Sequence, residues 1–232
     1  MINKIVIPIV FFLFLLLVWQ VSTSLFDIKE YMLPSPTDIL GKLFDSYELL
    51  IKHASATLFE AVAGFILGTT LALAIAFVIT YSSLIGLMIF PLIILIQTTP
   101  KIAIAPFLVI WLGFGFAPKI VVAATLVFFP IVIGTIKGLK TISPELLDLM
   151  NSYGANKWEM LFKVRIPSAL PYIFTAFKIA AAASVIGAVV GEFVGADIGL
   201  GYLILVANTN FDTSLIFASL TLLAIMGITF FF

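Results

Sequence analysis

The sequence contains no cysteine and a single histidine, His53. Without cysteine there are no disulfides and no thiolate metal sites, and one histidine cannot build a metal cluster by itself. Basic and acidic residues balance at twelve each, so no positive excess indicates a nucleic-acid partner. We therefore expect neither a metal site nor a nucleic-acid partner, and we interpret His53 as a polar residue at a membrane boundary.

Charged residues are scarce as well. They make up 10% of the chain, whereas soluble domains contain about 25%. Hydrophobic residues make up 62%, and the mean hydropathy is +1.25. The sequence therefore predicts an integral membrane protein, with the lipid bilayer as a partner.

Long apolar stretches predict the membrane-spanning helices, because a helix needs about 20 apolar residues to cross the hydrocarbon core. Six stretches qualify, near residues 5–24, 57–80, 84–112, 118–137, 170–195 and 213–232. The third contains the polar break 97–101, and we interpret it as one broken helix rather than two crossings. We expect a single all-α transmembrane domain over residues 1–232. A polar tail is expected after the sixth stretch, and the sequence ends at Phe232 without one.

The distribution of basic residues predicts the orientation, because short loops rich in lysine and arginine stay in the cytoplasm. Residues 137–165 contain Lys137, Lys140, Lys157, Lys163 and Arg165. Four crossings before this segment place the N-terminus in the cytoplasm too. Residues 25–56, with five acids and three lysines, then face outward. A cleaved signal peptide over residues 1–24 is the alternative, and a retained helix is favoured because the apolar run exceeds most signal-peptide cores.

Two of the apolar stretches carry small residues at four-residue spacing, a pattern that lets membrane helices approach closely. These residues are Ala61, Gly64, Gly68 and Ala72 in one stretch, and Ala183, Gly187, Gly191 and Gly195 in the other. We expect both faces to be buried in protein, either within one chain or across a dimer. Six helices leave little room for a solute path in one copy, which favours a second copy on a shared axis.

Residues 143–167 carry the signals of two short amphipathic helices. Ser143 is a suitable N-cap with Pro144 behind it, and Gly154 supplies a left-handed turn at the end of the first helix. Asn156 and Glu159 have the spacing of a capping box that opens the second helix, and Pro167 is expected to end it. The two helices either dock on a partner outside the bilayer or lie on the inner leaflet.

This segment resembles the loop shared by permease subunits of ABC importers. The pattern of that loop is Glu-Ala-Ala, three residues, Gly, nine residues, Ile, one residue, Leu-Pro. Gly154 takes the glycine place, Val164 the isoleucine place, Ile166 the leucine place and Pro167 the proline place. Asp148-Leu149-Met150 stands where Glu-Ala-Ala is usual, so an acid is kept while two bulky residues replace small ones.

Further motifs are similar to one branch of this family, the permeases of nitrate, sulfonate, taurine and related importers. In chain order they are Leu33-Pro34-Ser35-Pro36, Pro91 followed by Thr99-Pro100-Lys101-Ile102-Ala103, Trp111-Leu112-Gly113-Phe114-Gly115, Phe128-Phe129-Pro130 and Gly199-Leu200-Gly201-Tyr202. The resemblance covers roughly residues 30–230. Each motif is weak alone, and the ordered set together with the 143–167 segment is specific.

The resemblance implies a type I ABC importer permease fold, with a cytoplasmic coupling segment over residues 143–167 between helices four and five. It implies a homodimer in the bacterial inner membrane that works with two copies of a separate ATP-binding subunit and with an extracytoplasmic solute-binding protein. Alternating access would then import a small anionic solute such as nitrate, a sulfonate or taurine. The implied ATPase-coupling residues are Glu145, Asp148, Tyr153, Gly154, Ala155, Trp158, Glu159 and Pro167.

The chain itself has no Gly-x-x-x-x-Gly-Lys-Ser/Thr phosphate loop. We therefore expect ATP to bind the partner subunit, and we expect this chain to carry no catalytic site and no cofactor. An intramembrane enzyme is disfavoured by the lack of Gly-x-Ser-x-Gly and His-Glu-x-x-His motifs. An ion-coupled carrier or channel is the remaining alternative, and it would show inverted repeats or several paired acids in its spans.

Polar residues at membrane depth are candidates for the solute path. They are Gln97, Thr98, Thr99, Lys101 and Glu192. A proline-broken helix exposes backbone groups that only protein or a water-filled cavity can satisfy, and a lysine at the break suits an anionic solute. Alternatively, Lys101 pairs with Glu192 or reaches the outer surface. For Glu60 and Lys178, near the ends of their spans, we expect the side chains to snorkel to the interface.

Overall fold

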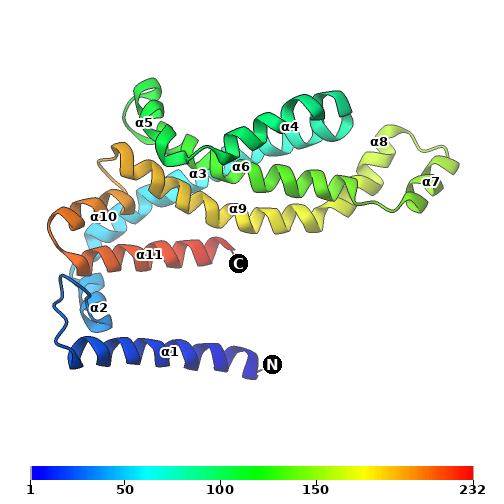
Figure 1. The fold of residues 1–232 in the computed structure, drawn as a ribbon. Coiled ribbons are helices and arrows are strands. Elements are labelled where there is room, and N and C mark those ends of the chain that lie inside the picture. Colours follow the sequence, from blue (N-terminus) through cyan, green and yellow to red (C-terminus); the bar gives the residue numbers. More distant parts are fainter. Residues whose placement is uncertain (1, 232) are drawn as a thin grey trace. The chain divides into compact units, whose positions relative to one another are not determined.

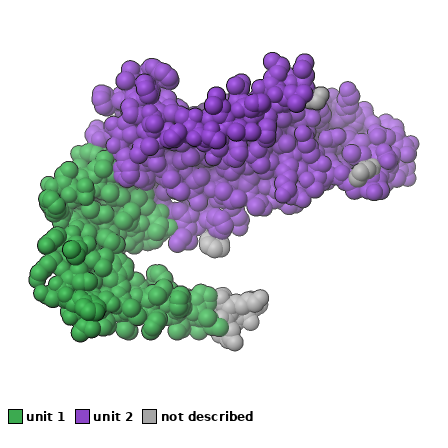
Figure 2. Space-filling view, in the orientation of Figure 1, with its two compact units in different colours: residues 1–56, 198–225 green, residues 57–197, 226–232 purple. Residues whose placement is uncertain are grey.

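The computed structural model of the protein describes residues 2–231, and the side chains of residues 6–82, 84–143 and 145–231. Within this range the regular elements are α-helices and one π-helical turn, with no strand (Figure 1). The predicted all-α fold class is therefore confirmed. The chain forms two compact units, residues 1–56 with 198–225 and residues 57–197 with 226–232 (Figure 2).

The first unit contains α1 (Ile2–Leu25), α2 (Pro36–Asp45) and α10 (Leu200–Thr209), together with the beginnings of α3 (Tyr47–Tyr81) and α11 (Thr213–Phe231). α2 starts where it does because Ser35 and Asp38 form a capping box. An ion pair of 2.6 Å between Lys42 and Asp212 links α2 to the turn between α10 and α11. The short helix α10 was not predicted from the sequence.

The second unit contains most of α3, α4 (Ser83–Thr98), α5 (Lys101–Leu112), α6 (Phe116–Lys140), α7 (Pro144–Ser152), α8 (Lys157–Glu159), the π-helical turn η1 (Met160–Arg165) and α9 (Ile166–Gly195). Its core lies where α6 contacts α3 and α9. The side chains of Val127, Ile131 and Val132 of α6 are fully buried there. α7 and α8 lie beyond the ends of α6 and α9 (Figure 1).

The small-residue faces pack on α6 within one chain. A Cβ at Gly68 of α3 would lie 2.6 Å from the Ala124 carbonyl oxygen, and one at Gly187 of α9 would lie 2.5 Å from the Ala123 Cα. These distances are shorter than any real Cβ contact, so only glycine lets the backbones approach this closely. The prediction that both faces are buried in protein is confirmed, and α6 is the helix that both of them meet.

Among the described residues, five helical stretches are long and apolar enough to cross a membrane, and the bent pair α4–α5 makes a sixth when it counts as one span. This agrees with the predicted six spans. The break within the pair falls at Thr99 and Pro100, inside the predicted 97–101. Thr99 has an extended backbone (φ −69°, ψ 128°), as expected for a residue that precedes proline. The helix axis turns there by 98°, which is typical of a broken span or a re-entrant loop.

Candidate functional site

α7 begins and ends at the residues that the sequence predicted. The Ser143 hydroxyl accepts a hydrogen bond of 3.4 Å from the Leu146 N–H, and Glu145 lies in the first turn, where an acid favours the helix dipole. The helix ends before Gly154, whose φ of +71° is a left-handed conformation. No atom lies within 4 Å of a Cβ built on Gly154, so the requirement for glycine comes from the backbone conformation alone.

A capping box starts α8. The Asn156 side-chain oxygen accepts from the N–H groups of Trp158 (3.0 Å) and Glu159 (2.9 Å), and the Glu159 carboxylate accepts from the Asn156 N–H (3.1 Å). Lys163 donates to the same carboxylate at 2.9 Å. The hydrogen bonds from Lys163 and Asn156 lower the pKa of Glu159, so this acid is charged at neutral pH.

The prediction that Pro167 ends this helix is wrong. The helix continues from α8 through η1 into α9, and Pro167 lies in the first turn of α9. In η1 the Ile166 N–H bonds the Leu161 carbonyl five residues back, which is π-helical pairing. At the change from π-helical to α-helical pairing, position 167 does not need to donate a backbone N–H. Proline has no N–H to donate, so Pro167 costs little here. Lys157–Gly195 is thus one continuous helical stretch.

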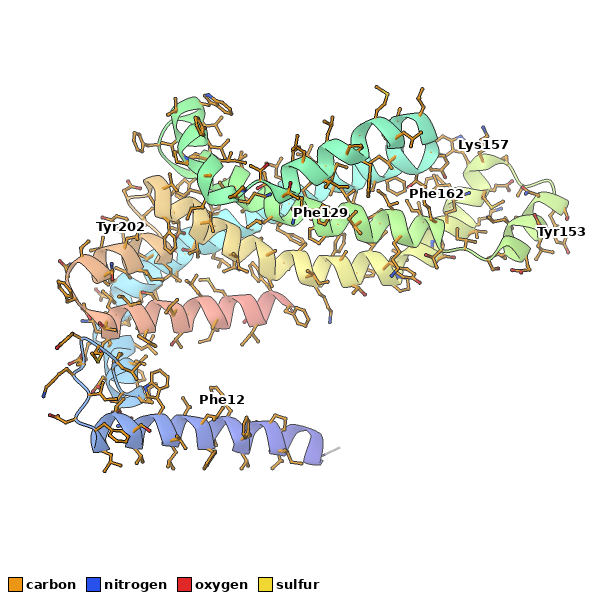
Figure 3. All side chains as sticks on the ribbon, viewed as in Figure 1. Phe12, Phe129, Tyr153, Lys157, Phe162 and Tyr202 are labelled. Carbon is orange, nitrogen blue, oxygen red and sulfur yellow. The ribbon has the colours of Figure 1, made fainter. Side chains whose placement is uncertain are left out.

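The segment 143–167 exposes large side chains. Tyr153 is 82% exposed, Trp158 69% and Leu149 51%, whereas Leu161 and Val164 are buried against the rest of the unit. Trp158 stacks on Phe162 with ring centroids 6.0 Å apart. Figure 3 shows Tyr153 and Phe162 on this segment. Exposed apolar and aromatic side chains on two capped helices are typical of an interaction surface.

A cluster of polar side chains lies inside the interface between α3, α6 and α9. Lys119 of α6 forms an ion pair of 2.8 Å with Glu60 of α3, and their side chains are 1% and 0% exposed. Glu192 of α9 is buried beside them and accepts a hydrogen bond of 2.6 Å from the Thr57 hydroxyl. We call Thr57, Glu60, Lys119 and Glu192 the buried cluster. It joins three helices through charged groups that are out of contact with solvent.

The expectation for Glu60 is therefore wrong, because its carboxylate is buried in an ion pair instead of reaching the interface. Glu60 lies one helical turn before Gly64 on the α3 face that meets α6, and this spacing is the signal that indicates its burial. Lys119 was not predicted as a functional residue. Lys178 is exposed, and its ammonium lies 5.8 Å from the centre of the Phe231 ring.

The predicted path residues do not come together. Gln97, Thr98, Thr99 and Lys101 surround the α4–α5 break, whereas Glu192 belongs to the buried cluster. The Lys101 ammonium donates to the carbonyls of Ile96, Gln97 and Thr99 at 2.5–3.1 Å, which occupies all three donors of a lysine. Within residues 6–231 it forms no ion pair. The alternative pairing of Lys101 with Glu192 is thus not found, and Lys101 caps the end of α4.

His53 is buried in the first unit. Its Nδ1 lies 2.9 Å from the Gly199 carbonyl oxygen and 3.1 Å from the Gly199 nitrogen, and its ring stacks on Tyr202. The Gly199–Tyr202 motif therefore holds this histidine in place. In the part of the chain that the structure describes, no group of three or more histidine or acidic side chains is arranged to hold a metal ion.

Comparison with known proteins assigns the family. A model of the family described as "binding-protein-dependent transport system inner membrane component" matches residues 64–232, well over half of the chain. The protein belongs to this permease family. A probable ABC transporter permease of Haemophilus influenzae is 37% identical over 94% of this chain and 89% of its own length.

Two further permeases have named solutes. The formylaminopyrimidine transport permease of Halalkalibacterium halodurans is 35% identical over 95% of this chain and 88% of its own length. A putative aliphatic sulfonates transport permease of Bacillus subtilis is 30% identical over 90% of this chain and 77% of its own length. The permease interpretation is thus confirmed, and none of these three relatives is named as an ion-coupled carrier.

The permease fold is confirmed by a solved structure. A chain of the MetNI methionine ABC transporter, in inward-facing conformations, matches with a TM-score of 0.70 at 21% identity. The match covers 80% of this chain and 93% of that chain. A permease of this family is a multi-pass membrane protein and a transport component rather than a catalytic subunit. The roles of the individual coupling and path residues stay predictions.

Proposed function

We propose that this permease is driven by a separate ATPase and that residues 143–167 are its docking segment. The observation that carries this proposal is the fixed, exposed geometry of α7 and α8. Each helix has its own N-cap, a left-handed glycine sets the angle between them, and Tyr153 at the bend is 82% exposed. Rigid aromatic side chains on a preorganised surface are typical anchors of a protein interface.

The continuous helix from α8 to α9 can transmit a movement of the docking segment to the membrane-spanning helices. α8, η1 and α9 form one stretch, Lys157–Gly195, and α9 packs along α6 through Gly134 and Gly138, whose built Cβ positions lie within 3.0 Å of Ala176 or Ala169. A force applied at α8 therefore reaches α9, and α6 must move with it. Alternating access requires that the ATPase bind this segment differently in the two states.

The assembly that we propose contains two copies of this permease, two ATPase subunits that bind and hydrolyse ATP, and an extracytoplasmic solute-binding protein. The permease is placed in the bacterial inner membrane with its N-terminus and residues 143–167 in the cytoplasm. The five basic residues between Lys137 and Arg165 support this orientation. Membership of the family supports the two kinds of partner.

The solute that we propose is a small anion of the sulfonate type, which the sulfonate-permease relative at 30% identity supports. A pyrimidine is the second candidate, since the relative named for formylaminopyrimidine transport has a higher identity of 35%. Proteoliposomes that contain the permease, its ATPase and its binding protein will separate the two classes. Uptake of a labelled alkanesulfonate that excess formylaminopyrimidine does not reduce will support the anion, and the reverse result will replace it with the pyrimidine.

A substitution at the bend tests the docking role. Gly154→Pro forces φ to about −65°, where the structure has +71°, and we expect it to abolish ATPase binding and uptake while membrane insertion stays normal. The matched control is Gly154→Asn, since asparagine tolerates a left-handed backbone. Co-purification of the ATPase with each variant and uptake into proteoliposomes are the measurements. Normal uptake by Gly154→Pro contradicts the proposal.

A further inference from the structure

Two adjacent hollows lie between the end of α3 and the helices α7, α8 and η1. The first, which we call the polar hollow, has a volume of about 380 Å³ and a mixed lining in which Asn151, Asn156 and Arg165 are polar. The second has a volume of about 670 Å³ and is lined almost wholly by apolar side chains, among them Phe77, Trp158 and Phe162. Tyr81 and Lys157 line both hollows, so the polar hollow opens beside the apolar one.

The charge of the polar hollow is positive. Lys157 and Arg165 are its charged lining residues, and neither has a carboxylate partner among the described side chains. Arg165 makes one long hydrogen bond of 3.4 Å to the Leu139 carbonyl, which leaves most of its five donors available. The nearby Glu159 is turned toward Lys163 and the Asn156 N–H. An anion in this hollow would therefore meet two cations.

A cationic hollow beside an apolar hollow indicates what kind of molecule would bind there. A small soluble anion would satisfy Lys157 and Arg165 and leave about 670 Å³ of apolar groove open. An uncharged hydrocarbon would fill the groove and leave both cations unpaired. A molecule with an anionic headgroup beside an acyl chain satisfies both, and basic pockets between membrane helices on the cytoplasmic side are known to bind such headgroups.

We propose that the hollows form a binding site for one anionic phospholipid, with its phosphate at Lys157 and Arg165 and an acyl chain along Phe77, Trp158 and Phe162. The site rests on the proposed cytoplasmic placement of residues 143–167, and it does not depend on ATPase docking. The bound lipid contacts both α3 and the docking segment. It therefore holds the docking segment against α3 from the membrane side.

Trp158 gives a direct readout, because bromine atoms on an acyl chain quench tryptophan on contact. The full-length permease carrying Trp19→Phe and Trp111→Phe is placed in nanodiscs, which leaves Trp158 as the single tryptophan. Brominated phosphatidylglycerol is titrated as a minor lipid into phosphatidylcholine, and brominated phosphatidylcholine into phosphatidylglycerol. We expect half-maximal quenching at about thirtyfold lower mole fraction for the anionic lipid, from two cations near one phosphate.

Substitutions of the two cations test whether the preference for the anionic lipid comes from the polar hollow. Lys157→Gln combined with Arg165→Gln is expected to remove the preference for the anionic lipid. Lys163→Gln is the matched control, since Lys163 is an exposed cation of the same segment that lines neither hollow, and it is expected to keep the preference. Lys157→Gln alone, at an exposed position, serves as the test if the double variant misfolds, and it is expected to reduce the preference about fivefold.

Three results would overturn the proposal. Equal quenching by both lipids would mean that Trp158 meets only bulk lipid. No quenching by either lipid would mean that protein covers the groove. A preference that 10 mM inorganic phosphate abolishes would mean that the polar hollow binds a small anion without a lipid chain. The assay contains no ATPase, so each of these results leaves the Gly154→Pro test of docking unaffected, and a failure of that test leaves the lipid site standing.

Discussion

Two ion pairs in this protein have the same chemistry and nearly the same length but very different surroundings. Lys119 and Glu60 are 2.8 Å apart with side chains 1% and 0% exposed, whereas Lys163 and Glu159 are 2.9 Å apart with side chains 65% and 38% exposed. The first pair lies in the close-packed α3–α6–α9 interface and the second lies on the segment 143–167. Distance alone therefore says little about what an ion pair contributes.

The difference follows from solvent. An exposed pair on a helix contributes about 0.3–0.5 kcal/mol, because water screens the charges and the long side chains lose freedom. A buried charge that loses its partner costs about 3–5 kcal/mol, because it stays desolvated without compensation. We infer that losing one partner of the buried cluster destabilises the helix bundle far more than losing one partner of the exposed pair.

The largest effect is expected from Lys119→Met. This change removes the cation from beside two buried acids, Glu60 and Glu192, and should lower the free energy of unfolding by about 3–5 kcal/mol. Thermal unfolding of the purified permease is the measurement. The matched control is Lys163→Met, with an expected loss of about 0.5 kcal/mol or less. Similar losses of unfolding free energy in Lys119→Met and Lys163→Met would contradict the claim that burial decides what an ion pair contributes.

A smaller effect is expected from Gly187→Ala. The added methyl group would lie 2.5 Å from the Ala123 Cα, and backbone on a packed helix cannot move aside cheaply. Overpacking of this kind should cost about 1–3 kcal/mol, measured by the same unfolding assay. Gly227→Ala in α11 is the control, since no atom lies within 4 Å of its built Cβ. An unchanged stability in Gly187→Ala would show that α6 and α9 have room to separate.

The smallest effect on stability is expected from Tyr153→Ala, which should change the free energy of unfolding by about 0.5 kcal/mol or less because the side chain is 82% exposed. If residues 143–167 dock on the ATPase, the same variant should weaken ATPase binding about tenfold or more. Titration of the ATPase against the permease in nanodiscs measures this. Phe211→Ala is the control, with a side chain 77% exposed outside the docking segment. If Tyr153→Ala lowered the stability but not the affinity for the ATPase, residues 143–167 would serve stability rather than recognition.

Local signals predicted the segment 143–167 well, because caps and left-handed glycines act within a few residues. Ser143, Gly154 and Asn156 do in the structure what their side chains and backbones predict. Pro100 likewise marks the α4–α5 break, since proline restricts the residue before it. The exception is Pro167, because the π-helical turn before it depends on packing that no local rule contains.

The buried cluster was harder to predict, because it depends on which helix faces meet. α3 begins at Tyr47, ten residues before the apolar stretch that predicted it, so Glu60 lies well inside the helix and not near its end. The hydrophobic pattern did not indicate which face of α3 is buried, since residues 57–80 contain few polar side chains. The spacing of Glu60 and Gly64 contained the needed information, but only the position of α6 reveals it.

The π-helical turn η1 also sets which side of α8 is presented. A π-helical turn accommodates one residue more than an α-helical turn, and each residue of an α-helix advances the chain by about 100° around the axis. α8, which continues directly into η1, is therefore rotated by about 100° from where an uninterrupted α-helix would put it. Deleting a single residue between Met160 and Arg165 would turn a different face of α8 outward, and it would also change how η1 packs against α9. If residues 143–167 dock on the ATPase, the six residues of η1 thus set which face of α8 the ATPase meets.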